Sequence, residues 1–141
     1  MKHLHNAAVA LVVVIGAATF ALSAAAAGGN NPTADIQAGN GACGADLTAL
    51  PVVGFTNYHR TGNSVSVQYH LKNALPNATY IVQLWGDACS YFGTVTTITT
   101  NSNGVANGTG SLTVPATSTR FFATAWGPNG WNDTPAVTLA P

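Results

Sequence analysis

The sequence predicts an all-β domain, a Greek-key β-sandwich of about seven strands. Apolar and polar residues alternate one by one along Val65–Lys72 and again along Tyr80–Trp85. This period of two is typical of half-buried strands, because successive side chains point to opposite faces of a sheet. Turn residues separate further strand-like runs at intervals of roughly 8–12 residues. Such spacing favours a sandwich over a parallel sheet covered by helices.

The first residues predict an export signal. A basic start at Met1–His5 is followed by an apolar run, Ala7–Leu22, and then by the small residues Ala24–Ala27. These three parts in this order are typical of a secretory signal peptide, which we assign to residues 1–27. The mature protein is therefore expected outside the cell or at its surface. The alternative is a membrane anchor, since the apolar run is nearly long enough to span a bilayer.

The remaining chain is short and close to neutral. The sequence has 141 residues, and its four Lys and Arg balance four Asp and Glu. This length leaves no room for two ordinary domains. We expect a flexible lead-in over residues 28–42 and a sandwich domain over residues 43–141, monomeric by default. A neutral surface makes nucleic acid and anionic membranes poor partners.

The two cysteines, Cys43 and Cys89, predict one disulfide. An even pair in an exported protein is typical of a disulfide rather than of free thiols. The chain-entropy model assigns a bridge of this span about 4 kcal/mol of stabilisation.

The first half of the domain predicts an edge strand and a hairpin. Asp46–Val53 is assigned to an edge strand, because Pro51 inside it is tolerated where its missing N–H faces no neighbour. Residues 59–63 contain Gly and Asn, which accept positive φ, and predict the loop that leads into the strand from Val65.

The second half predicts four further strands. Gly93–Thr100 is dense in β-branched residues, which suit a pleated sheet. The turn at Asn103-Gly104 follows, and Val105–Val114 returns as the next strand. Arg120–Trp126 is a further strand, and Pro135–Leu139 closes the fold as a short edge strand.

The runs Tyr80–Leu84, Gly110–Pro115 and Thr134–Leu139, with the turn at Asn103-Gly104, resemble small secreted immunoglobulin-like β-sandwich domains of bacteria. The likeness covers most of the mature chain, and it implies an adhesion, binding or spacer module. A looser likeness is to chromophore-carrying apoproteins of the neocarzinostatin type, which have two disulfides where this chain has cysteines for one. Neither family supplies a catalytic motif that matches these residues.

Ionisable residues are too few to favour an enzyme. After the leader, His59 and His70 are the histidines, and no glutamate occurs anywhere in the sequence. After residue 27 the sequence contains no Gly-x-Ser-x-Gly elbow, no His-x-His pair and no Cys-x-x-Cys pair. A Ser–His–Asp triad assembled from distant positions stays open. We expect no catalytic residue, no metal and no cofactor.

The aromatic residues of the second half predict a contact surface. If Tyr80 faces the core, alternation places Gln83 and Trp85 on the outer face, and the same reasoning places Trp126 outward. Trp131 lies in a loop rich in Gly, Pro and Asn. A strand register shifted by one residue would reverse these faces, and tryptophans that fill the core are the alternative. The predicted ligand-binding residues are Trp85, Gln83, Trp126, Asn129 and Trp131.

Flat aromatic rings beside amide groups suit sugar rings, which offer an apolar C–H face and hydroxyl edges, and they also suit a protein partner. The sequence therefore predicts a secreted, non-catalytic binding module for carbohydrate or an extracellular protein. One alternative is a carrier that holds a small apolar ligand in a cleft between the sheets. A hydrolytic enzyme is the third.

Overall fold

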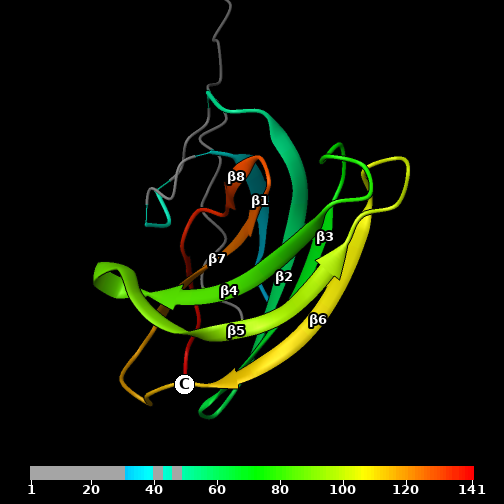
Figure 1. Cartoon of the computed structure of the whole chain (residues 1–141). Coiled ribbons are helices and arrows are strands. Elements are labelled where there is room, and N and C mark those ends of the chain that lie inside the picture. Colours follow the sequence, from blue (N-terminus) through cyan, green and yellow to red (C-terminus); the bar gives the residue numbers. More distant parts are fainter. Residues whose placement is uncertain (1–30, 40–42, 46–48) are drawn as a thin grey trace, which may run out of the picture.

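The computed structural model describes residues 31–39, 43–45 and 49–141 (Figure 1). The predicted signal peptide, residues 1–27, lies outside the described residues, as do residues 46–48 of the predicted first strand. Within the described part, no helix has the length and apolar character needed to cross a membrane.

The described chain is all-β, as predicted. Nine strands form one antiparallel sheet with the order β5-β4-β7-β8-β1-β2-β3-β6, and β9 pairs with β7. A single 3₁₀ turn, η1, connects β4 to β5. In chain order the elements are β1 (Thr33–Ala38), β2 (Val52–Thr61), β3 (Ser64–Leu71), β4 (Thr79–Gly86), η1 (Asp87–Cys89), β5 (Ser90–Thr99), β6 (Ala106–Thr113), β7 (Arg120–Gly127), β8 (Gly130–Asp133) and β9 (Val137–Thr138).

The two ends of this strand order pack against each other, so the sheet is nearly closed into a barrel (Figure 1). Glycines of β6 permit the contact. A Cβ atom on Gly108 would lie 2.3 Å from Cγ2 of Ile98 in β5. A Cβ atom on Gly110 would lie 2.3 Å from the carbonyl oxygen of Val95. Any larger residue at either position would therefore push β5 away from β6.

Two segments that the sequence placed outside the strands lie in the middle of the sheet. Thr33–Ala38, assigned to the flexible lead-in, forms β1 and pairs with both β2 and β8. Gly130–Asp133, assigned to a loop, forms β8 and pairs with β7. The structure therefore corrects both assignments. Ile36 is the one large apolar side chain of β1, and β8 has only four residues, so neither shows a clear alternation.

The predicted edge strand is also corrected. β2 begins at Val52, directly after Pro51, and it is central because β1 and β3 flank it on either side. The hairpin loop predicted over residues 59–63 is shorter than expected. Thr61 already pairs with Ser64, which leaves a two-residue turn in which Gly62 has a φ of 55°.

The predicted facing of the two central strands is confirmed. In β3 and β4 every second residue is buried and apolar, from Val65 to Leu71 and from Tyr80 to Leu84. The residues between them face outward, and in β4 these include Ile81 and Trp85. The largest fully buried side chains that fill the interior are Arg60, Tyr58, Tyr69, Tyr80, Phe121, Ile36, Leu71, Leu84, Leu139, Val65, Val67 and Val82.

Two buried tyrosines connect strands across this interior. The hydroxyl of Tyr58 lies 2.6 Å from Oγ1 of Thr134 and accepts the N–H of Ala123 at 2.8 Å. The hydroxyl of Tyr69 donates to the carbonyl of Asn132 at 2.7 Å. These bonds connect β2 and β3 to β7 and β8, because each buried phenol reaches a hydrogen-bond partner on the opposite side of the interior.

The buried tyrosines predict a loss of stability in alkali. Burial raises the pKa of Tyr58 and of Tyr69 well above the ordinary value, and the hydrogen bonds of Tyr58 offset this only in part. Below about pH 10 both phenols are neutral in the folded and unfolded chains. Above it the unfolded chain loses its protons first, so the free energy of unfolding falls by up to about 1.4 kcal/mol per pH unit for each tyrosine.

Urea unfolding measured from neutral pH into the alkaline range tests this expectation. Tyr58→Phe, which leaves Oγ1 of Thr134 to accept the Ala123 N–H at 3.0 Å, is expected to make the alkaline slope shallower. If the free energy of unfolding fell equally steeply with pH in the variant and the wild type, the alkaline loss of stability could not be assigned to Tyr58.

Arg60 is also buried, with 2% of its surface exposed, where β2 ends beside the β6–β7 connection. Its Nε donates to the carbonyl of Gly62 at 2.7 Å, and the guanidinium carbon lies 5.5 Å from the centre of the Phe121 ring. The cation is thus surrounded by carbonyl dipoles and a ring face. The remaining carbonyl acceptors of the guanidinium are those of Pro115, Ala116, Ser118 and Leu139.

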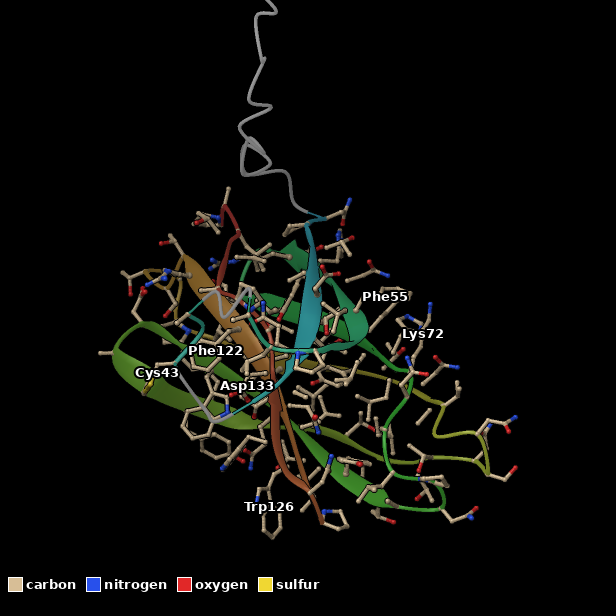
Figure 2. All side chains as sticks on the ribbon, turned by 90° about the horizontal axis from the view of Figure 1, so that it is seen from above. Cys43, Phe55, Lys72, Phe122, Trp126 and Asp133 are labelled. Carbon is tan, nitrogen blue, oxygen red and sulfur yellow. A yellow bond between two sulfur atoms is a disulfide. The ribbon has the colours of Figure 1, made fainter. Side chains whose placement is uncertain are left out.

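The predicted disulfide between Cys43 and Cys89 is confirmed, with the two Cα atoms 5.3 Å apart. It fastens the segment before β2 to the 3₁₀ turn between β4 and β5. Gly44, with a φ of 72°, then lies against the ring of Phe122, so close that a Cβ atom there would be 2.8 Å from Cδ1. Figure 2 shows Cys43 and Phe122 on the same side of the barrel.

Candidate functional site

The outer face of β4, β7 and β8 carries most of the predicted contact residues. Antiparallel pairing sets residues of neighbouring strands directly opposite each other, so the outward side chains form rows across the sheet. Two rows are rich in aromatic rings, and a polar row lies between them. The rows are Ile81 with Trp126 and Trp131; Gln83 with Thr124 and Asp133; and Trp85 with Phe122.

Trp126 and Trp131 form the first aromatic group. They are cross-strand partners in the β7–β8 hairpin, and their ring centroids are 6.5 Å apart at an interplanar angle of 50°. Trp126 has 50% of its surface exposed and projects from the ribbon in Figure 2, whereas Trp131 is partly buried. The turn between them therefore presents a pair of indole rings to solvent.

A hollow of about 420 Å³ adjoins Trp131. Asn129 at the hairpin turn lines it, and Oδ1 of Asn129 accepts a hydrogen bond from the hydroxyl of Tyr80 at 3.0 Å. That bond orients the amide and leaves its NH₂ group free to donate. The hollow thus combines a ring with amide groups, and its other lining residues are Ala38, Gly39, Gly130 and Asn132.

Trp85 and Tyr91 form the second aromatic group. Their ring centroids are 4.9 Å apart, and Tyr91, which is not among the predicted contact residues, has 51% of its surface exposed. Trp85 is partly buried because it stacks on Phe122 at 6.3 Å with an interplanar angle of 13°. Its indole N–H donates to Oγ1 of Thr124 at 3.1 Å, so this ring has a fixed orientation.

Gln83 lies between the two aromatic groups. It pairs with Thr94 of β5 on one side and with Thr124 of β7 on the other. The side chain is partly exposed, but its Oε1 atom is buried and makes no hydrogen bond in the described structure. An unsatisfied buried acceptor destabilises a fold by about 1–3 kcal/mol, and most buried polar atoms in proteins are therefore hydrogen-bonded. The Oε1 atom of Gln83 is an exception to this rule.

Part of the outer face is covered. Phe122 is only 4% exposed, and Thr124 is only 2% exposed, although both point away from the barrel interior. Gly44 packs on the Phe122 ring, and the N–H of Ala136 donates to the carbonyl of Gly44 at 2.7 Å. The open part of this face, here named the aromatic strip, runs along β4, the start of β5 and the β7–β8 hairpin. The aromatic strip consists of Trp126, Trp131, Ile81, Gln83, Trp85 and Tyr91.

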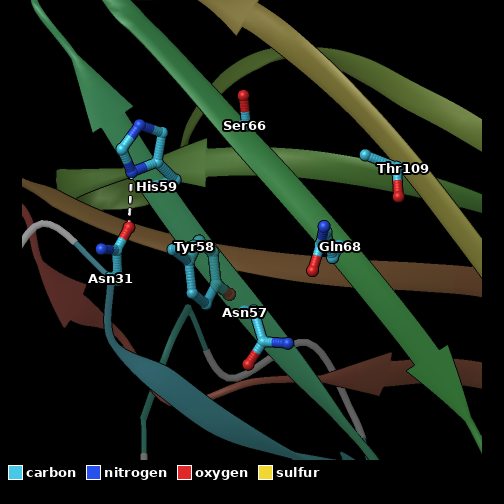
Figure 3. Close-up of a pocket in the computed structure, with 7 residues that line it drawn as sticks. All are labelled: Asn31, Asn57, Tyr58, His59, Ser66, Gln68 and Thr109. Atoms are coloured by element: carbon cyan, nitrogen blue, oxygen red, sulfur yellow. Dashed lines mark hydrogen bonds between the residues drawn. The ribbon is translucent and has the colours of Figure 1, made fainter.

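A second hollow, of about 520 Å³, lies on the outer face of β2, β3 and β6, and it was not predicted (Figure 3). The sequence signal was the run of polar residues that alternates with the core positions of β3, which is equally typical of an ordinary solvent-facing side. The lining residues are Asn31, Asn57, Tyr58, His59, Ser66, Gln68 and Thr109.

His59 in this hollow has two side-chain partners. Its Nδ1 atom bonds to Oδ1 of Asn31, and its Nε2 atom lies 3.0 Å from Oγ1 of Thr61. A hydroxyl, an imidazole and an orienting amide are connected as in nucleophilic sites. Here His59 and Thr61 are exposed, so water competes for these bonds, and His70 stacks on Phe55 at 4.5 Å rather than joining them.

Metal ligands do not gather in the described ranges, where no group of three or more His, Cys, Asp or Glu side chains could hold an ion. Comparison with known proteins adds no family: no protein-family model and no curated protein matches the chain.

Proposed function

We propose that this protein is a secreted, non-catalytic binding module that contacts carbohydrate through the aromatic strip. The half-exposed Trp126 and its partner Trp131, which lines the amide-rich hollow, carry the proposal. Indole rings pack against the apolar C–H face of a sugar, and amide groups such as that of Asn129 bond to its hydroxyl edges. A soluble protein gains no stability from solvent-facing indoles, so their clustering favours contact with a ligand.

Export is supported by the disulfide, since such bonds persist in oxidising compartments. It agrees with the signal peptide proposed for residues 1–27. We also infer kinship with immunoglobulin-like β-sandwich domains. The antiparallel pairing and the single disulfide support this kinship.

A surface site suits this fold better than an internal one. The carrier alternative needs room between the sheets, whereas Tyr58, Tyr69, Tyr80 and Phe121 fill the interior. An apolar ligand would have to displace these side chains from a closely packed core. An extracellular protein is the other partner suited to an exposed aromatic surface.

Tryptophan fluorescence tests the proposal. The mature protein is titrated with neutral soluble polysaccharides, namely hydroxyethyl cellulose, arabinoxylan and a β-1,3-glucan, with iodide quenching as a measure of exposure. We expect a saturable shift with protection from iodide. Trp126→Ala is expected to weaken binding at least about tenfold, as for an aromatic residue at the centre of an interface.

Phe55→Ala is the matched control, because Phe55 is a partly exposed ring on β2 rather than on the aromatic strip (Figure 2). This variant is expected to bind like the wild type. A wild-type chain that responds to none of the three polysaccharides would contradict a carbohydrate partner and direct attention to a protein.

A further inference from the structure

The aromatic strip contains two separate platforms for rings. Ile81, in the row of Trp126 and Trp131, and Trp85, beside Tyr91, are four residues apart on β4. A strand rises about 3.3 Å per residue, so the platforms are about 13 Å apart along β4. A monosaccharide resting on one platform cannot reach the other, and a chain of sugars can.

Gln83 supplies the polar contact between the platforms. It is two residues from each end of this stretch, so its amide faces the middle of any ligand that spans both. Its Oε1 atom makes no hydrogen bond in the described structure. A sugar hydroxyl would satisfy this acceptor when the side chain turns outward, which would remove the free-energy cost of leaving it unpaired.

The charge of the strip selects the class of sugar. Its own side chains are uncharged, and Asp133, at the end of the row of Gln83, is buried. The ion pair found among the described residues joins Arg120 and Asp87 at 3.9 Å, with both side chains more than half exposed. A balanced, solvated pair attracts neither sign of charge strongly. An acidic polysaccharide would therefore gain nothing here over a neutral one.

We propose that the aromatic strip binds a neutral, extended oligosaccharide that runs along β4, with Gln83 hydrogen-bonded to a sugar between the two platforms. This inference rests on the proposed function and adds the length, charge and orientation of the ligand. The binding energy then comes from three places along the oligosaccharide, namely the two platforms and Gln83, rather than from one.

Ladders of oligosaccharides test the length requirement. β-1,4-gluco-, β-1,4-xylo- and β-1,3-gluco-oligomers, from the monosaccharide to the hexasaccharide, correspond to the three polysaccharides used above. We expect the affinity to rise by at least about tenfold with length and then level off once both platforms are occupied. Tyr91→Ala is expected to abolish this gain for the long oligomers and leave the short ones unaffected, because the exposed Tyr91 belongs to one platform only.

Gln83→Met separates recognition from folding. Methionine has a similar length and no buried acceptor, so the free energy of unfolding should stay the same or rise. Affinity for the long neutral oligomers should fall about tenfold, as expected for a lost hydrogen bond in a recognition site. If Gln83 had a purely structural role, the variant would lose stability and keep its affinity.

The outcomes distinguish a failure of carbohydrate binding itself from a failure of the proposed length, orientation and charge of the ligand. No response to any polysaccharide contradicts the proposed function itself. Polysaccharide binding with the same affinity at every oligomer length, or unaffected by both Tyr91→Ala and Gln83→Met, overturns this inference and leaves the proposed function standing. Tighter binding of oligogalacturonate than of the neutral ladders overturns the charge assignment.

Discussion

Arg60→Ala is expected to lower the free energy of unfolding by about 3–5 kcal/mol, a large part of the stability of a small domain. The guanidinium is buried and donates hydrogen bonds to carbonyls that come from three separate parts of the chain. Alanine would leave a cavity and several acceptors without donors. The β6–β7 connection and the segment at Leu139 would lose the side chain that holds them together.

Urea denaturation of the protein measures this effect. Arg120→Ala is the matched control, since Arg120 is exposed and its ion pair with Asp87 is long, and it should change stability by less than about 0.5 kcal/mol. The free energy of unfolding of Arg60→Lys should lie between those of the two alanine variants, because an ammonium keeps the charge but cannot reach carbonyls in several directions at once. Equal stabilities for Arg60→Ala and Arg120→Ala would refute the role of the buried network.

Loss of the disulfide is expected to have a comparable effect. The double variant Cys43→Ala with Cys89→Ala should lose about 4 kcal/mol, because the bridge closes a long loop, with a sequence separation of 46, in the unfolded chain. The packing of Gly44 on Phe122 should weaken as well, and with it the support of the Trp85 ring. Tryptophan fluorescence should therefore shift to longer wavelength before the chain unfolds.

The reduced wild-type protein supplies the control for this variant. Dithiothreitol should bring the wild-type unfolding midpoint down to that of the double variant and should leave the variant unchanged. A double variant as stable as the oxidised wild type would show that the bridge adds nothing to the fold.

Local alternation predicted those parts of the fold that depend on which face is buried. Tyr69 and Leu71 in β3, and Val82 and Leu84 in β4, are buried as the period of two requires. The same alternation placed Trp85 on the outer face. The disulfide followed from the predicted compartment and the cysteine count, which are read from the whole chain.

Other parts of the fold depend on partners that are distant in sequence. β1 is a strand because β2 and β8 pair with it on either side, and its own residues, apart from Ile36, are polar or small. Arg60 was assigned to a hairpin loop because Gly and Asn follow it in residues 59–63. Its burial depends on carbonyls of the β6–β7 connection, which no local pattern reveals.

The candidate site was predictable residue by residue but not as an arrangement. Trp126 and Trp131 could each be selected as aromatic residues, yet their contact depends on β8, which was taken for a loop. Tyr91 lies before the strand predicted from Gly93, whereas β5 begins at Ser90 and sets Tyr91 beside Trp85. The row through Gln83 exists only once the register of β4 and β7 is known.

The close packing of β5 on β6 has a consequence for how molecules of this protein meet one another. Strands at the border of a sheet can recruit strands of another molecule, which is a route to aggregation. Gly108 and Gly110 let the two terminal strands lie against each other, so each shields the other from such recruitment. The exposed aromatic surface is therefore not joined by two free strand borders through which molecules of this protein could pair.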